Sequence, residues 1–139
     1  MNIIFYWKKS YFKNEYQKVL SNYKLYTDYP PKGIASGDTM WIVTKNEDGY
    51  VLVSKLIIEK TQREPSVHGD FSIVGDQSAS VFYKLDNANN KAFLSAINNL
   101  TQWPNDEFGK YFQGERHIQE LYNIAHQEFE KFSKTLQTI

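Results

Sequence analysis

The sequence predicts an α+β domain built around a small open β-barrel with mainly antiparallel strands. Residues 39–44 and 50–59 are two β-rich runs separated by a turn that contains Asp48 and Gly49, which is the pattern of a β-hairpin. Both faces of the first run are largely apolar, and this indicates a strand covered on both sides, as in a closed or wrapped sheet. The predicted order of strand, helix, several strands and helix completes the α+β assignment.

The N-terminal part predicts a strand followed by a helix. Residues 3–7 form the first strand, and Ser10 can cap a helix from about Tyr11 to Lys24. Five residues of this helix recur at helical spacing and are expected in the core: Phe12, Tyr16, Val19, Leu20 and Tyr23. Pro30 and Pro31 end this unit and lead an extended chain to the hairpin.

The C-terminal half predicts a second hairpin and two helices. Residues 61–69 are expected as a loop, 71–74 and 80–85 as paired strands, and 91–100 as a short helix. Residues 116–136 predict a long amphipathic helix with this apolar stripe: Ile118, Leu121, Tyr122, Ala125, Phe129, Phe132 and Leu136. The stripe either closes the barrel or meets a second copy of the chain.

Composition indicates a single domain spanning residues 1–139. The 139 residues are 41% hydrophobic and 16% aromatic, which is enough for a core without metals or disulfides. The absence of cysteine excludes disulfide scaffolds, zinc ribbons and thiol nucleophiles. The N-terminus lacks the pattern of a signal peptide and the apolar runs are short, so a cytoplasmic protein without a membrane span is expected.

The charge distribution favours one end of the chain as a ligand surface. The net charge is zero, yet residues 1–27 hold five lysines against Glu15 alone. Nine aromatic residues fall in or just beyond this segment: Phe5, Tyr6, Trp7, Tyr11, Phe12, Tyr16, Tyr23, Tyr26 and Tyr29. Such a mixture is typical of surfaces where bases stack and phosphates are screened, although a lysine-coated helix with core aromatics explains it equally.

No catalytic or metal-binding pattern is apparent. The three histidines are scattered, and His117 and His126 lie nine residues apart, unlike metal ligands at i and i+4 of one helix. The chain contains no phosphate-binding glycine loop and no nucleophile elbow. A protein that is not an enzyme, with no cofactor and no metal, is therefore expected.

Several short stretches resemble the PUA-like superfamily, particularly EVE-type domains attached to HNH and other modification-dependent restriction nucleases. The stretches are residues 6–10, 37–43, 50–58, 75–83 and 108–116. The resemblance implies an open β-barrel that takes a flipped, modified base into a pocket of aromatic and polar side chains. Trp7 and Ser10 match the family's N-terminal pocket segment, and Asp38 matches the turn of the hairpin, whereas Tyr11 and Phe12 replace the Glu-Pro that often follows the serine.

The predicted function is therefore a non-catalytic nucleic-acid-binding module, with modified DNA rather than RNA as the expected ligand and a nuclease as a candidate partner subunit. Trp7 or Trp103 is expected to stack on the base, and Ser10 or Gln77 to hydrogen-bond its edge. The residues expected to contact phosphate are Lys8, Lys9, Arg63 and Arg116. The alternative is a protein-interaction domain or homodimer that uses the C-terminal helix and has lost the pocket.

Overall fold

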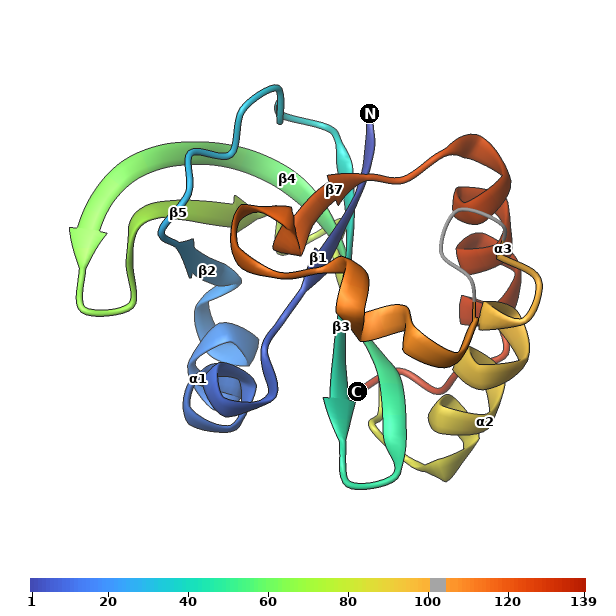
Figure 1. The fold of residues 1–139 in the computed structure, drawn as a ribbon. Helices are drawn as coiled ribbons and strands as arrows, with labels where there is room; N and C mark the ends of the chain where they lie inside the picture. The colour runs from blue at the N-terminus through green and yellow to red at the C-terminus, as the bar shows by residue number, and fades with distance from the viewer. Residues whose placement is uncertain (101–104) are drawn as a thin grey trace.

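The computed structural model describes residues 1–100 and 105–139, which form a curled, open sheet flanked by helices (Figure 1). The strands are β1 (Asn2–Tyr6), β2 (Lys24–Thr27), β3 (Thr39–Asn46), β4 (Gly49–Ser66), β5 (Gly69–Gly75), β6 (Val81–Phe82) and β7 (Ile118–Glu120). The α-helices are α1 (Lys9–Asn22), α2 (Asn87–Ile97) and α3 (Asn123–Ser133), and two 3₁₀-helices, η1 (Asn105–Tyr111) and η2 (Gly114–His117), precede β7.

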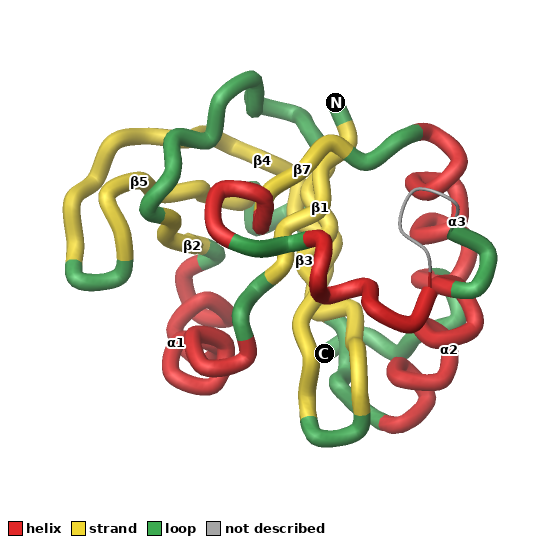
Figure 2. The backbone as a smooth tube through the Cα atoms, in the orientation of Figure 1, coloured by secondary structure: helices red, strands yellow, loops and turns green. Residues whose placement is uncertain are grey.

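The sheet is mixed, and its strand order is β2-β5-β4-β3-β1-β7, with β6 paired to β4. β1 runs parallel to β3, whereas the other neighbouring strands are antiparallel. The long strand β4 pairs with β3 along its first half and with β5 along its second half. Figure 2 shows that this second half, with β5 and β2, curls away from α2 and α3. In this strand order, β2 and β7 are the two edge strands of the sheet.

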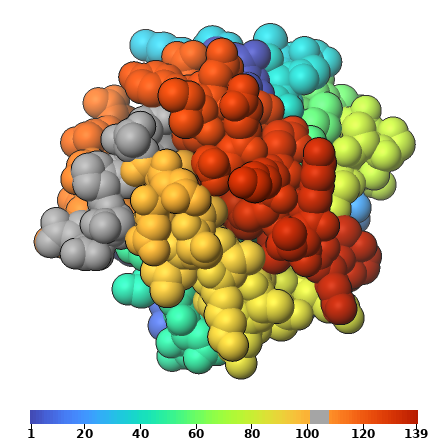
Figure 3. Space-filling view, turned by 90° about the vertical axis from the view of Figure 1, so that its right-hand side faces the viewer, coloured from blue at the N-terminus to red at the C-terminus, as the bar shows by residue number. Residues whose placement is uncertain are grey.

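Strand alternation divides the core between the two faces of the sheet. Ile4 and Trp41 point to one face, where they pack with side chains of α2, of α3 and of residues 108–112. Ile3 and Met40 point to the other face, into the concave side that α1 covers. Figure 3 shows α2 and α3 lying side by side on the surface of the molecule. Two cores on one sheet explain why both faces of the central hairpin are apolar.

The structure confirms the α+β class, the central hairpin and the N-terminal helix. β3 and β4 join at a turn that contains Asp48 and Gly49, and Trp41 is fully buried, as expected for a core residue. In α1, Val19 is buried, and the other four residues expected in the core pack against the concave-side cluster. The helix begins at Lys9 with Lys8 as its N-cap residue, so the prediction that Ser10 caps it was wrong.

The prediction of one long helix over 116–136 was wrong. Residues 114–117 form η2, residues 118–120 form β7 antiparallel to β1, and the α-helix α3 begins only at Asn123. The spacing of Ile118 and Leu121 fits a helix. Residues 118–120 instead pair as a strand with β1, because the backbone N–H and C=O groups at the edge of β1 need hydrogen-bond partners. Four residues of the predicted apolar stripe are buried in the core of this chain: Leu121, Ala125, Phe129 and Phe132.

Four other predictions differ from the structure. Residues 61–66 continue β4 rather than forming a loop, and β6 pairs with β4 rather than with β5. Residues 24–27 form β2, which the sequence analysis placed at the end of a helix and in the connection after it. Asp86 caps α2, so this helix begins at Asn87, before the start at residue 91 that the sequence predicts. In each case, the local sequence pattern is ambiguous, and the secondary structure is determined by pairing with a distant strand or, for α2, by the Asp86 cap.

Among residues 1–100 and 105–139, no helix is long and apolar enough to span a membrane.

Candidate functional site

A cleft of about 550 Å³ lies where the two edges of the open sheet approach each other. Four segments line it: the end of β1 with the start of α1, residues 26–29 at the end of β2, the tip of the β4–β5 hairpin, and residues 109–117. Figure 1 shows the segment that leads into β7 crossing in front of β1 and approaching β2. The volume falls in the range of pockets that bind ligands of drug or nucleotide size.

Aromatic side chains form much of the wall. They come from three of the four segments, and they are Phe5, Tyr6, Trp7, Tyr11, Tyr26, Tyr29 and Phe112. Tyr11 and Tyr29 are 56% and 40% exposed, so their rings remain open to a ligand. Tyr6 stacks on Phe112 with ring centroids 5.4 Å apart, and burial, with a smaller contribution from Tyr50, raises the pKa of Tyr6 to about 12. The wall is therefore neutral and aromatic at physiological pH.

The polar side chains of the cleft are Lys8, Glu15, Thr27, Asp28, His68, Gln113 and His117. Lys8 holds its Nζ 5.6 Å from the ring centroid of Tyr11. Glu15 accepts a contact of 2.8 Å from Nδ1 of His68, which ties α1 to the tip of the β4–β5 hairpin. The lining thus combines two carboxylates and one lysine with two imidazoles.

His117 closes the seam between the two edges of the sheet. Its Nδ1 lies 2.7 Å from the carbonyl oxygen of Gly114, which can only accept, so Nδ1 carries the hydrogen. Its Nε2 then accepts from the hydroxyl of Thr27 at 3.0 Å. Burial lowers the pKa of His117, outweighing the opposite effects of the Gly114 carbonyl and of Asp28. The ring is therefore a neutral imidazole that joins the end of β2 to the start of β7.

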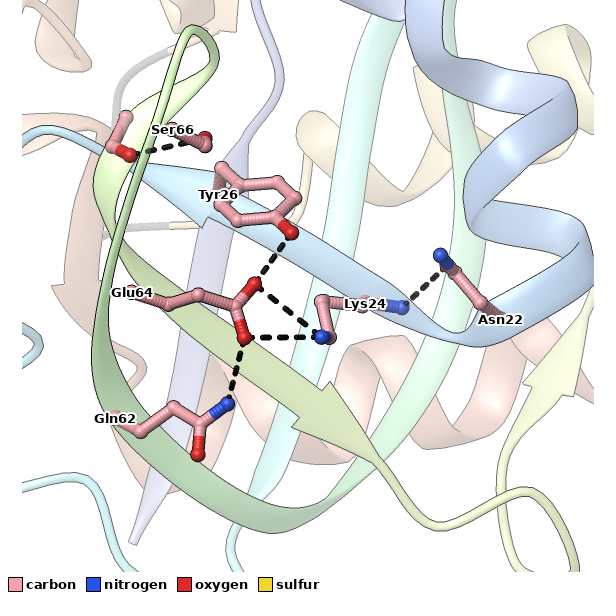
Figure 4. Close-up of polar contacts among 7 residues, drawn as sticks. Asn22, Lys24, Tyr26, Gln62, Glu64 and Ser66 are labelled. Carbon is pink, nitrogen blue, oxygen red and sulfur yellow. Dashed lines mark hydrogen bonds and ion pairs between the residues drawn. The ribbon is translucent and has the colours of Figure 1, made fainter.

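A polar network behind the cleft holds Tyr26 in place (Figure 4). Glu64 on β4 accepts hydrogen bonds from the Tyr26 hydroxyl, from Lys24 Nζ at 3.1 and 3.2 Å, and from Gln62 Nε2 at 2.8 Å. The bond from Tyr26, followed by that from Lys24, lowers the pKa of Glu64, and the same bond raises the pKa of Tyr26. Glu64 therefore acts as an anionic acceptor that orients the phenol ring.

The structure brings together only part of the predicted site. Trp7 and Lys8 line the cleft. Trp7 is only 4% exposed, because its ring packs edge-on against Phe12 and Tyr16. Lys9 pairs with Glu47 at 3.1 Å.

The remaining predicted residues do not line the cleft in the described part of the chain. Ser10 is exposed in the first turn of α1, and Arg63 is exposed on β4. Gln77 is exposed in the turn after β5, and Arg116 is exposed in η2, next to the lining residue His117. Trp103 lies outside the described residues.

Six polar residues of the lining were not predicted as members of the site: Glu15, Thr27, Asp28, His68, Gln113 and His117. The aromatic part of the lining was visible as the cluster of rings in the first 29 residues. For the segment around His117, the available signal was the pair Gly109 and Gly114 flanking aromatic residues, in a stretch that also carries the family resemblance. What brings these segments together is the pairing of β7 with β1.

Comparison with known proteins adds no relative. The chain matches no protein-family model, no curated protein and no solved structure at a significant level. Within the described part of the chain, no group of three or more His, Cys, Asp or Glu side chains is arranged to hold a metal ion.

Proposed function

We propose that this chain is a non-catalytic nucleic-acid-binding module of the PUA-like, EVE type, which takes a flipped, modified base into the cleft. The observation that carries the proposal is the cleft itself, with a wall of tyrosine, tryptophan and phenylalanine rings and a lysine beside Tyr11. Aromatic faces replace the stacking that a base loses when it leaves a duplex, and polar groups at the wall replace its edge hydrogen bonds.

Phosphate contacts make a small contribution in this proposal. Lys9 and Lys13 share Glu47 at 3.1 and 3.4 Å, and Lys24 pairs with Glu64. These pairs reduce the basic character of the N-terminal segment, and the whole chain is neutral. Affinity for unmodified nucleic acid should therefore be weak at physiological salt, so that recognition depends on the base.

Tyr29 is the residue that tests the proposal. Stacking on one aromatic ring contributes about 1–3 kcal/mol per base, so Tyr29→Ala should weaken binding by about 5- to 150-fold. Trp7 is a poor probe, because removal of a buried tryptophan ring costs about 3–5 kcal/mol of folding stability. Tyr122→Ala is the matched control, because Tyr122 is 63% exposed at the start of α3 and does not line the cleft.

The experiment is a titration by fluorescence anisotropy with labelled oligonucleotides, single- and double-stranded, at low and moderate salt. They carry cytosine, 5-methylcytosine, 5-hydroxymethylcytosine or N6-methyladenine at one position. Selective binding of one modified base that Tyr29→Ala weakens and Tyr122→Ala preserves would support the proposal. No binding of any oligonucleotide, or equal losses in both variants, would contradict it.

A further inference from the structure

The charges that line the cleft restrict the kind of base it can accept. The charged side chains of the lining are two carboxylates, Glu15 and Asp28, and one lysine, Lys8, and Glu15 is in contact with Nδ1 of His68 at 2.8 Å. Lys8 is exposed and lies near the ring of Tyr11. The basic composition of residues 1–27 is thus not reproduced inside the cleft.

The aromatic wall adds to this negative character. The faces of aromatic rings carry negative electrostatic potential and attract cations, most strongly where water is excluded. Tyr11 and Tyr29 are open to a ligand, and Asp28 lies one residue before Tyr29 at the same rim. The field of Asp28 reaches into the cleft, because it opposes the effect of burial on the pKa of His117. A flat, positively charged ring would be stabilised by both the rings and the carboxylates.

We infer that the cleft selects a base carrying a delocalised positive charge, that is, a purine or pyrimidine alkylated on a ring nitrogen. This inference rests on the proposed function and specifies its ligand class. A methyl group on N1 of adenine or N3 of cytosine both creates the charge and blocks the Watson–Crick edge. A base that cannot pair is the least expensive to flip out of a duplex. That property suits a neutral protein whose phosphate contacts supply little binding energy.

The cleft volume favours a nucleobase over a small ammonium group. About 550 Å³ is space for a nucleotide, whereas a quaternary ammonium head would leave much of the cleft filled with water. The neutral His117 ring is held by Gly114 and Thr27, so it adds no repelling charge. A peptide with a trimethylated lysine is the competing ligand, because aromatic rings and carboxylates also attract quaternary ammonium groups.

Two isomer pairs separate charge from size. N1-methyladenine is cationic near neutral pH, whereas N6-methyladenine is neutral, and the two differ only in the position of the methyl group. N3-methylcytosine and 5-methylcytosine form the second pair in the same way. Each base is placed at the centre of the same short single-stranded oligonucleotide, and the dissociation constants of the four are compared at pH 7. We expect the cationic member of each pair to bind about tenfold more tightly.

Asp28→Asn removes one carboxylate without changing the shape of the cleft. It should reduce the preference for each cationic base over its neutral partner by about threefold or more. Asp48→Asn, at an exposed carboxylate in the β3–β4 turn that does not line the cleft, is the matched control and should change neither. Thermal unfolding checks that both variants fold.

The outcomes distinguish this inference from the proposed function. Equal affinity within each pair, together with preference over unmodified bases, would overturn the selection for charge and retain a base-binding cleft. Tighter binding of a trimethyllysine peptide than of any oligonucleotide would overturn the inference in favour of an ammonium site. No binding of any oligonucleotide would overturn both.

Discussion

The hydroxyl of Thr27 and Nε2 of His117 lie 3.0 Å apart, although the two residues are 90 positions apart in the chain. Thr27 is the last residue of β2, and His117 directly precedes β7, so the bond joins the two open edges of the sheet. Thr27 also accepts from the backbone N–H of Tyr29 at 3.2 Å. One buried hydroxyl therefore links both edges of the sheet to the rim of the cleft.

Thr27→Val should destabilise the fold by about 1–3 kcal/mol, because it leaves the acceptor of His117 and the N–H of Tyr29 without this partner while preserving side-chain shape. Urea denaturation followed by circular dichroism measures the difference. Thr61→Val on β4 is the control, where a change within about 0.5 kcal/mol is expected for a half-buried strand position. Equal effects of the two substitutions would show that the Thr27 bond contributes nothing specific.

Stability should fall as the pH decreases below about 6.5. Burial lowers the pKa of His117, and it lowers the pKa of His126, whose Nδ1 accepts from the Trp41 indole at 3.0 Å. Between each folded-state pKa and the unfolded value, the unfolded chain binds more protons than the folded chain. Stability is therefore complete above the unfolded pKa and is lost as the pH falls toward the folded one.

The free energy of unfolding, measured from pH 7.5 to 5, checks this dependence. His117→Gln and His126→Gln should each flatten the curve, because each removes one titrating group. The carboxylates with lowered pKa values, Glu64 and Asp38 among them, lose their contribution only at lower pH, since their unfolded pKa values are near 4. An unchanged slope in both histidine variants would contradict the assignment.

Asn89→Ala should cost about 2–4 kcal/mol, because it orphans several buried backbone groups. The Asn89 amide accepts from the N–H of Leu52 at 2.9 Å and donates to the carbonyl oxygens of Leu52 and Lys84 at 2.8 and 2.9 Å. These bonds hold the first turn of α2 against β4 at Leu52, two residues before Ser54, where β6 pairs with β4. Asn87→Ala, at an exposed position of the same helix, should cost far less, and thermal unfolding of both variants measures the difference.

Gly69→Ala should separate the β4–β5 hairpin from the end of β2. An added Cβ would lie 2.7 Å from the backbone carbon of Thr27, and φ is +146°. Backbone cannot yield as a side chain does, so a loss of about 1–3 kcal/mol is expected. Gly37→Ala is the control, because Gly37 has φ of +90° but nothing within 4 Å of the added atom. Urea denaturation should show the larger loss at Gly69, and equal losses would attribute the effect to backbone strain alone.

Local patterns in the sequence were sufficient for the central elements. Two β-rich runs on either side of the turn at Asp48 and Gly49 predicted the β3–β4 hairpin, and helical spacing from Phe12 to Tyr23 predicted α1, because each pattern lies within one short window. The aromatic residues before Pro30 were visible as a cluster, with a stacking surface as one of two interpretations, and six of them line the cleft. These features depend on neighbours in the chain, so the sequence displays them directly.

The tertiary structure was needed wherever the conformation or the ion pairing of a segment depends on residues far away in the chain. Ile118 and Leu121 fit a helix by spacing, yet the free edge of β1 makes residues 118–120 a strand and brings His117 to Thr27. Lys9 looked available for phosphate, but it pairs with Glu47 across the fold. Strand-edge pairing and ion pairing connect residues tens of positions apart, so neither produces a periodic pattern within one segment of the sequence. The aromatic residues of the cleft wall were therefore visible in the sequence as a cluster, whereas most of the polar residues of the cleft, its closure and its charge balance were not.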